Sequence, residues 1–347
     1  ALIFPGHQWK NADKKHQRLM LQELMRSDVS DEADRKALLD TLGNSDPETE
    51  VAVVSLLGKA KERRAVSKLI GHLTQKNHDV KLASMDALAE IGDERAIAPL
   101  EDTLSEQLHF GRPNPISKFG AKALPRLIKK GDETFIKNPK TKADQERLQQ
   151  HRLIARTIGE IRDLAAKEDL VKLLSSQSSD MKINAARSLM TMKMKEAEPA
   201  VAELLNDEDI DVKTKTIGML LPIDTPRYLP SAIEFLQSKQ PPLRGQTAEV
   251  IGNLKVAEAV PALEKLLMDP TDTVRYRSAK ALKKITGKDY EYKKTRFTEK
   301  LERSSEEWKL LNEGRYKEFK PNQTSIESDD ERRQATEKLR QKGLMAE

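Results

Sequence analysis

The sequence predicts an all-α fold, an α-solenoid of stacked two-helix repeats of about 31 residues each. Three observations predict it: apolar columns at one fixed interval, helical spacing within each unit, and a composition typical of exposed helices. The columns recur once in every repeat and are Met181, Val212, Leu243, Val274; Leu189, Leu220, Ile251, Leu282; Met192, Ile223, Leu254, Ile285; and Pro199, Pro230, Pro261. Self-similarity at a fixed period is the signature of a stacked-repeat protein.

Each unit is expected to contain two helices, and residues 79–106 are the clearest copy. The first helix carries apolar residues at helical spacing, at Val80, Ala83, Ala87, Leu88 and Ile91. Gly92 follows and is free to take the left-handed conformation that ends a helix. Pro99 then falls in the first turn of the second helix, where no backbone donor is lost. Neither helix can bury its apolar stripe alone, so neighbouring units must stack. The Ala83, Ala87, Leu88 and Ile91 columns are expected to be buried in every unit.

Composition agrees with this fold and limits the function. Apolar residues make up 37% of the 347 residues and charged residues 34%, which is typical of helices with a wide exposed face. A solenoid has no upper length limit, because each unit contacts only its neighbours. No run of about 20 apolar residues is present, so no transmembrane segment is expected. The chain has no cysteine, which excludes disulfides and thiolate catalysis.

The N-terminal half is expected to be regular. Residues 1–12 lack helical spacing and are predicted to form an extended arm, and residues 13–106 are predicted to form the N-terminal repeats. Asp31 to Leu42 is one expected helix, with Asp28 or Ser30 able to cap it. Shifting Leu100 and Leu104 back by two periods gives Leu38 and Leu42, which places this helix in register with the repeats.

The period breaks in residues 107–149, which we interpret as one degenerate unit with two projecting basic loops. The next position equivalent to Val80 in the repeat is Gln150. The segment begins with the turn-forming run 109–115. A short helix at 117–130 and a loop at 131–142 are expected. From Ser105 to Arg152 there are 11 Lys/Arg and 5 Asp/Glu, so the positive excess of the chain is concentrated here.

This basic segment has three interpretations. It is a solvated loop edge, a docking site for an acidic partner, or a nucleic-acid contact. The candidate partner-binding residues are Arg112, Lys118, Lys122, Lys129, Lys130, Lys137, Lys140 and Lys142. Insertions in solenoids map to loops and often to binding surfaces.

Regular repeats resume over residues 150–286 and end in a different kind of sequence. Residues 287–320 hold six of the 14 aromatic residues and are predicted to cap the open end of the solenoid. Residues 321–347 form a charged tail that is predicted to become helical on a partner, including a second copy of the chain. The candidate partner-binding residues in these two segments are Tyr290, Tyr292, Trp308, Tyr316, Phe319 and Leu339.

The segment Asp79–Leu100 resembles a HEAT-like repeat of the phycobilin-lyase type, whose pattern is roughly D-V-R-x-A-A-A-x-A-L-G-x-I-G-D-x-x-A-x-P-x-L. The resemblance extends over residues 46–106 and 150–286. Thr286-Gly287-Lys288-Asp289-Tyr290 is similar to the sequence that ends many bacterial HEAT-like domains. The resemblance implies a stacked-helix fold, while the function stays open because this repeat serves scaffolds, lyases and other enzymes.

No catalytic, cofactor-binding or metal-binding residues are predicted. Deoxyhypusine hydroxylase, an enzyme on similar repeats, uses repeated His-Glu pairs, and none of the six histidines here is followed by glutamate. No HExxH, P-loop or GxSxG motif is present. The histidines are expected to be exposed or in turns.

Nucleic-acid binding has one feature in its favour, a cationic column at Lys81, Lys182, Lys213, Arg244 and Arg275. In HEAT repeats this residue also pairs with acids between units. The neighbouring columns mix charges of both signs, whereas a groove that follows phosphates needs one sign throughout.

The sequence therefore favours a non-catalytic helical-repeat scaffold that binds protein partners in a bacterial complex, without a cofactor. The alternatives are a phycobilin-lyase-like subunit and a HEAT-like nucleic-acid-binding protein. The start at Ala1 and the absence of cysteine favour a periplasmic or otherwise exported protein, with the cytoplasm as the alternative.

Overall fold

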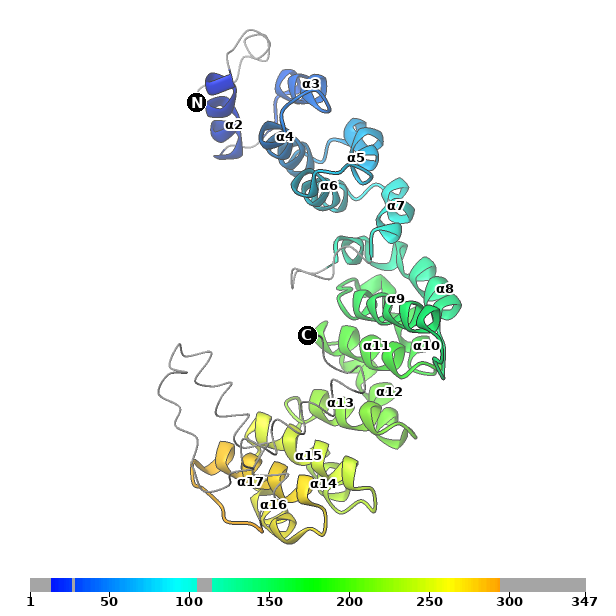
Figure 1. Cartoon of the computed structure of the whole chain (residues 1–347), viewed down its shortest axis with the longest axis vertical. Coiled ribbons are helices and arrows are strands. Elements are labelled where there is room, and N and C mark those ends of the chain that lie inside the picture. The colour runs from blue at the N-terminus through cyan, green and yellow to red at the C-terminus, as the bar shows by residue number, and fades with distance from the viewer. Residues whose placement is uncertain (1–13, 27–28, 105–113, 294–347) are drawn as a thin grey trace, which may run out of the picture.

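The protein is a curved rod made of helices alone over the part that the structure describes (Figure 1). The computed structural model describes residues 14–26, 29–104 and 114–293. These residues form sixteen α-helices and several short 3₁₀ turns, and they contain no strand. The all-α repeat fold expected from the sequence is confirmed.

The helices form two layers. The first helices of the units lie on the concave side of the rod and the second helices on the convex side (Figure 1). The first helices are α2 (Lys14–Arg26), α4 (Pro47–Lys59), α6 (His78–Ile91), α9 (Lys142–Gly159), α11 (Ser179–Thr191), α13 (Ile210–Leu220), α15 (Pro241–Leu254) and α17 (Asp272–Thr286). The second helices are α3 (Glu32–Thr41), α5 (Val66–His72), α7 (Ile97–Asp102), α8 (Leu124–Thr134), α10 (Lys167–Leu173), α12 (Glu198–Ala202), α14 (Thr225–Leu236) and α16 (Val260–Lys265).

Side-chain caps set the starts of the first helices. The side chains of Asp46, Asn77 and Ser178 accept hydrogen bonds from the backbone N–H groups of Thr49, Val80 and Met181, at 3.3, 3.0 and 3.2 Å. Each bond satisfies one of the donors that a helix start leaves unpaired. Gly92 ends α6 in the left-handed region (φ 69°), as the sequence predicts.

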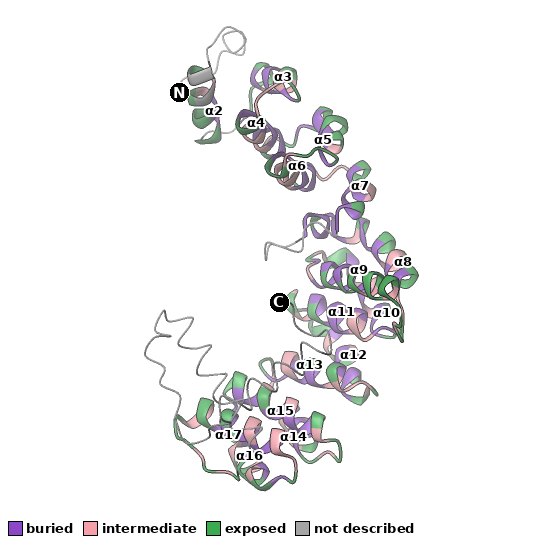
Figure 2. Ribbon diagram, viewed as in Figure 1, coloured by how far each residue is buried: buried purple, intermediate pink, exposed green. Residues whose placement is uncertain are grey.

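The core lies between the two layers, where Figure 2 shows the buried faces of the helices. The predicted Leu88 column is confirmed throughout, since Leu88, Leu189, Leu220, Ile251 and Leu282 are all fully buried. The neighbouring columns are partly wrong. In the Ile91 column Ile223 is 50% exposed and Leu254 38%, because both lie where a first helix ends and the chain turns. In the Ala83 column an exposed residue, Lys215, takes the equivalent position.

The second helix of one late unit also differs from expectation. The sequence places Pro230 in a first helical turn, like Pro199 and Pro261. In the structure α14 begins at Thr225, five residues before Pro230, so Pro230 lies in the interior of the helix. Pro226 occupies the first turn instead.

The degenerate unit keeps its second helix and loses its first. Its first-layer position is taken by the 3₁₀ segment η4 (Pro115–Lys122), which packs against α6 and α7. The backbone N–H of Ala121 donates to the Asp163 carboxylate of the next unit at 2.8 Å. The segment 105–113, which includes the first predicted loop, lies outside the described residues.

The second predicted loop is shorter than expected. α8 continues to Thr134 and α9 begins at Lys142, so the connection covers only residues 135–141. Thr141 and Asp144 form a reciprocal capping box that fixes the start of α9. The predicted boundary between residues 149 and 150 therefore falls inside α9.

Two buried threonines give a prediction about stability. The hydroxyls of Thr216 and Thr247, which occupy equivalent positions in two successive repeats, are buried and have no hydrogen-bond partner. Thr216→Val and Thr247→Val keep the side-chain shape and remove a buried unpaired polar group. We expect each to raise the free energy of unfolding by about 1 kcal/mol in urea titrations.

Thr214→Val is the matched control on the same helix. Its hydroxyl donates to the Ile210 carbonyl at 2.9 Å and lies 3.0 Å from the Gln246 side-chain oxygen. Loss of these contacts should lower the stability. The prediction fails if all three valine variants destabilise the protein equally.

Candidate functional site

Some of the predicted basic residues hold the stack together. Lys122 pairs with Glu94 of the preceding unit at 3.0 Å. Lys130 lies 3.0 Å from Glu101 and 3.6 Å from Asp102. Glu101 is buried and also accepts a hydrogen bond from Arg126 at 3.0 Å. Lys122 and Lys130 therefore form ion pairs with the preceding unit.

The remaining cations of this segment are exposed. Lys129 lies 4.0 Å from Glu133 on the same helix, which is a weak contact. Lys118, Lys137, Lys140 and Lys142 are exposed, and no carboxylate of the described residues forms an ion pair with them. Arg112 lies outside the described residues. Lys137, Lys140 and Lys142 are grouped at the short connection between α8 and α9.

Two of the predicted C-terminal residues are described. Tyr290 is half-buried and packs against the core behind α17. Tyr292 is half-buried in the segment that follows, where the Arg275 guanidinium donates to the Lys293 carbonyl at 3.1 Å. This arrangement fixes how the chain leaves the last described unit. Trp308, Tyr316, Phe319 and Leu339 lie outside the described residues.

The cationic column has a structural role. Lys182 reaches Asp207 at 2.6 Å and Arg244 reaches Asp269 at 2.7 Å, each from a first helix to the turn 25 residues later. Arg275 donates to the Asp269 carbonyl at 2.7 Å. Burial acts to raise the pKa of Asp269, but hydrogen bonds from Arg244 and Thr271 outweigh it and leave the pKa lowered. These cations are committed to bonds within the stack.

Two histidines are buried, so the expectation that all are exposed or in turns is wrong. The His151 ring lies 2.9 Å from the Gly131 carbonyl and 2.6 Å from the Ser178 hydroxyl. His72 lies 3.2 Å from the Ser84 hydroxyl, and burial lowers its pKa although Glu50 is close. Both link helices of adjoining units. No group of three or more His, Asp or Glu that could hold a metal ion occurs in the described ranges.

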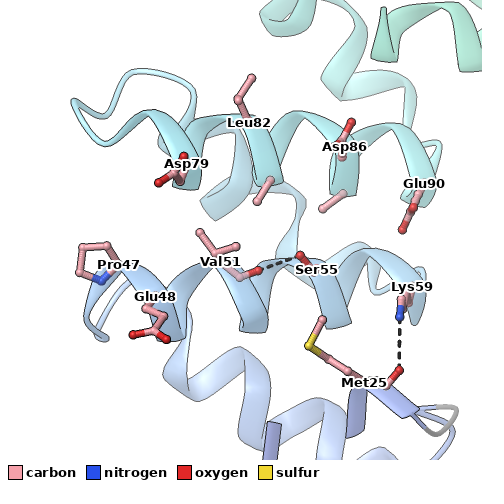
Figure 3. Close-up of a pocket in the computed structure, with 12 residues that line it drawn as sticks. Met25, Pro47, Glu48, Val51, Ser55, Lys59, Asp79, Leu82, Asp86 and Glu90 are labelled. Carbon is pink, nitrogen blue, oxygen red and sulfur yellow. Dashed lines mark hydrogen bonds between the residues drawn. The ribbon is translucent and has the colours of Figure 1, made fainter. Parts of the chain in front are cut away.

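A concave groove lies between α4 and α6, with a volume of about 800 Å³. We call it the α4–α6 groove. It is lined by Met25, Pro47, Glu48, Val51, Ser55, Lys59, Asp79, Leu82, Ala83, Asp86, Ala87 and Glu90. Figure 3 shows Glu48 and Asp79 at one end and Lys59 and Glu90 at the other. Val51 and Leu82 supply apolar surface between these ends, and Met25 lies beside Lys59.

The groove residues follow directly from the repeat. Position 48 is equivalent to 79, 51 to 82, 55 to 86 and 59 to 90, because the members of each pair are one repeat period apart. Equivalent residues of adjacent first helices lie side by side, so two consecutive units build one continuous strip. The strip carries an acid at both ends of α6 and at the start of α4, because Glu48, Asp79 and Glu90 occupy these columns.

The groove is negatively charged. Four carboxylates line it against one cation, Lys59, which donates to the Met25 carbonyl at 3.4 Å. Within the described part of the chain, no cation forms an ion pair with Asp79 or Glu90, and both are exposed. The groove therefore combines apolar surface with a net negative charge, an arrangement suited to apolar side chains flanked by cations.

The first-helix layer changes sign along the rod. α4 and α6 together carry five acids and two lysines, a net charge of −3. The five first helices from α9 to α17 carry 14 Lys/Arg and six acids, a net charge of +8. α2, the first helix beside them, carries four Lys/Arg and one acid, a net charge of +3, so the negative charge is confined to α4 and α6.

Stacked helix pairs with a shared core and no strand in the described residues define an α-solenoid repeat protein. The chain belongs to the family of HEAT repeats, which it matches over residues 12–109, 143–221, 167–246 and 229–293. The stretch between the first two matches, 110–142, contains the 3₁₀ segment and α8 of the degenerate unit. No curated protein sequence matches the chain significantly.

Several solved structures are similar to this chain. Human deoxyhypusine hydroxylase is 16% identical, covers 82% of this chain and 95% of its own, and gives a TM-score of 0.31. The CpcE–CpcF complex of phycocyanin lyase from Nostoc sp. PCC7120 is 16% identical, with coverages of 72% and 94% and a TM-score of 0.27. Kap121p is 12% identical, with coverages of 82% and 37% and a TM-score of 0.43. At these identities the likeness concerns the fold alone.

The described part of the chain has no helix that is long and apolar enough to cross a membrane. The export favoured by the sequence stays a prediction.

Proposed function

We propose that this HEAT-repeat chain is a non-catalytic scaffold of a bacterial protein complex, and that the α4–α6 groove is its main contact with a protein partner. The observation that carries the proposal is the groove itself, in which apolar surface lies between carboxylates on two adjacent helices. Helical grooves of this kind bind protein segments through a few apolar anchors, while the charged rim selects the partner.

The charge of the groove specifies the chemistry of the partner. Four carboxylates against one lysine favour a segment with apolar side chains next to lysine or arginine. Because Glu48, Asp79 and Glu90 are exposed, their attraction is screened within about 8 Å at physiological ionic strength. Partner binding should therefore weaken as salt is added.

A second contact is assigned to the exposed cations at the connection between α8 and α9. Lys137, Lys140 and Lys142 lie close together in sequence, and no described carboxylate pairs with them. They suit an acidic surface on the partner. Lys122 and Lys130 are left out of this contact because their charges are used between units.

The experiment uses the full-length chain as bait in its source cells. The groove variant Asp79→Asn/Glu90→Lys removes the negative charge of the groove without touching the core. Its matched control, Glu258→Gln/Glu264→Lys, makes the same charge change at exposed positions around α16. We expect quantitative mass spectrometry to recover one set of proteins with the wild type and the control, and to lose at least 90% of it with the groove variant, which corresponds to about 1.4 kcal/mol or more of binding free energy.

Equal recovery with all three baits would contradict the assignment of the groove. Thermal melts of the variants serve as the folding control, and both should melt close to the wild type because surface substitutions usually change stability by about 0.5 kcal/mol or less. Covalent attachment of a bilin to an acceptor protein by the purified chain would contradict the non-catalytic part of the proposal.

A further inference from the structure

The α4–α6 groove has a defined length and a defined charge pattern. From Glu48 to Lys59 one wall extends over roughly 16 Å at 1.5 Å per helical residue. Carboxylates lie at both ends of the groove, Val51 and Leu82 lie between these ends, and Met25 lies beside Lys59 (Figure 3). A matching segment is therefore about six residues long when extended, with apolar side chains near its middle and cations around them.

The chain itself contains such a segment beyond the described residues. Residues 315–320 read Arg-Tyr-Lys-Glu-Phe-Lys, with three cations, one acid and two aromatic residues. Fully extended, six residues cover roughly 20 Å, so the segment is long enough to cover the groove wall of roughly 16 Å. Tyr316 and Phe319 are of the residue types that interfaces use as anchors, and they were candidate partner-binding residues on sequence grounds alone.

The position of the described chain end indicates which copy supplies the segment. The chain leaves α17 at Lys293, whose carbonyl is held by Arg275. α17 lies at the opposite end of the rod from α4 and α6 (Figure 1). The described chain therefore ends beside the end of the rod that lies away from its own groove.

We propose that the α4–α6 groove binds the basic aromatic segment 315–320 of a second copy of this chain. The inference rests on the proposed function and names the occupant of the same site. Because one end of a copy binds the other end of the next, the contact is heterologous and propagates head to tail.

The test mixes two full-length variants, each of which lacks one half of the contact. The groove variant is Asp79→Asn/Glu90→Lys, and the tail variant is Arg315→Glu/Lys317→Glu/Lys320→Glu. Sedimentation velocity should show concentration-dependent assembly for the wild type and a monomer for each variant alone. A one-to-one mixture should form a dimer that does not grow, because only one intact groove and one intact tail can meet.

Salt and a charge-matched variant complete the test. Raising the ionic strength to about 1 M should shift the mixture toward monomers, since the contact depends on exposed charges. The control Glu258→Gln/Glu264→Lys should assemble as the wild type does. A wild type that stays monomeric, a groove variant that still assembles, or a mixture that forms no dimer would each overturn the inference.

The two proposals fail in different ways. If the mixture forms no dimer but other proteins still depend on the groove for recovery from cells, the groove binds a different chain and only the self-contact is wrong. If the groove variant recovers the same partners as the wild type, the proposed function itself is wrong.

Discussion

Gly120→Ala is expected to destabilise the centre of the solenoid by about 3 kcal/mol or more, because this position accepts only glycine. Gly120 has φ 58° and ψ −131°, a conformation that residues with a Cβ atom rarely adopt. A Cβ atom there would lie 2.2 Å from an oxygen and 2.6 Å from the Cβ of Asp163. The substitution therefore adds backbone strain and a steric clash at once.

The clash also affects hydrogen bonds between two units. The Asp163 carboxylate accepts from Ala121 N–H at 2.8 Å and from Ala165 N–H at 3.0 Å. Displacing Asp163 leaves these donors unpaired, and together they fix η4 against the start of the next second helix. We expect Gly120→Ala to increase amide hydrogen exchange over residues 114–134 before it affects the distant units, since repeat proteins are stabilised mainly by contacts between neighbours.

Gly71→Ala is the matched control. Gly71 lies in α5, and nothing lies within 4 Å of the Cβ atom that alanine would add. In a helix this change should be neutral or stabilise by up to about 1 kcal/mol. If Gly120→Ala unfolds at the same urea concentration as Gly71→Ala, the conformation described at Gly120 is wrong.

The repeat could be predicted from the sequence because its strongest signal coincides with its core. The Leu88 column is fully buried wherever the repeat period places it. Burial was harder to predict for the columns at the ends of the first helices. Ile223 and Leu254 are apolar like the rest of their column, although the turn exposes them. Residue type alone does not distinguish these two environments, because an exposed apolar residue is common on protein surfaces.

The start of α9 was missed although the sequence contains the signal for it. Thr141 and Asp144 have the spacing of a capping box and lie directly before the helix. The repeat register pointed to Gln150 instead, and α9 simply extends further toward its N-terminus than the other first helices do. A local capping signal was the better guide here than the period.

The groove could have been found from the same columns that predicted the fold. Leu82 and Asp86 occupy surface positions on the first helix of their unit. Val51 and Ser55 occupy the equivalent positions one period earlier. The surface faces of α4 and α6 therefore lie side by side and form the groove. The ion pairs of Lys122 and Lys130 could not be predicted in this way, because they depend on how the degenerate unit packs against α7.

Leu189→Ala and Ile251→Ala are each expected to lower the free energy of unfolding by about 2–5 kcal/mol, through lost transfer free energy and a residual cavity. Both side chains are fully buried in the continuous core, on α11 and α15. Circular dichroism during urea unfolding measures the change, and hydrogen exchange shows whether it spreads from the altered unit to its neighbours.

Ile223→Ala removes the same atoms as Ile251→Ala, but it does so where half of the side chain already meets water. Little transfer free energy is lost there and no closed cavity forms, so we expect a change of about 1 kcal/mol or less. Because both variants remove the same atoms, the difference between their free energies of unfolding reports how deeply each side chain is buried. If Ile223→Ala proves as damaging as Ile251→Ala, the side chain that the structure leaves at the turn is packed in solution, and the register of the columns has to be revised. If both are harmless, the predicted stacking of α13 and α15 is itself contradicted.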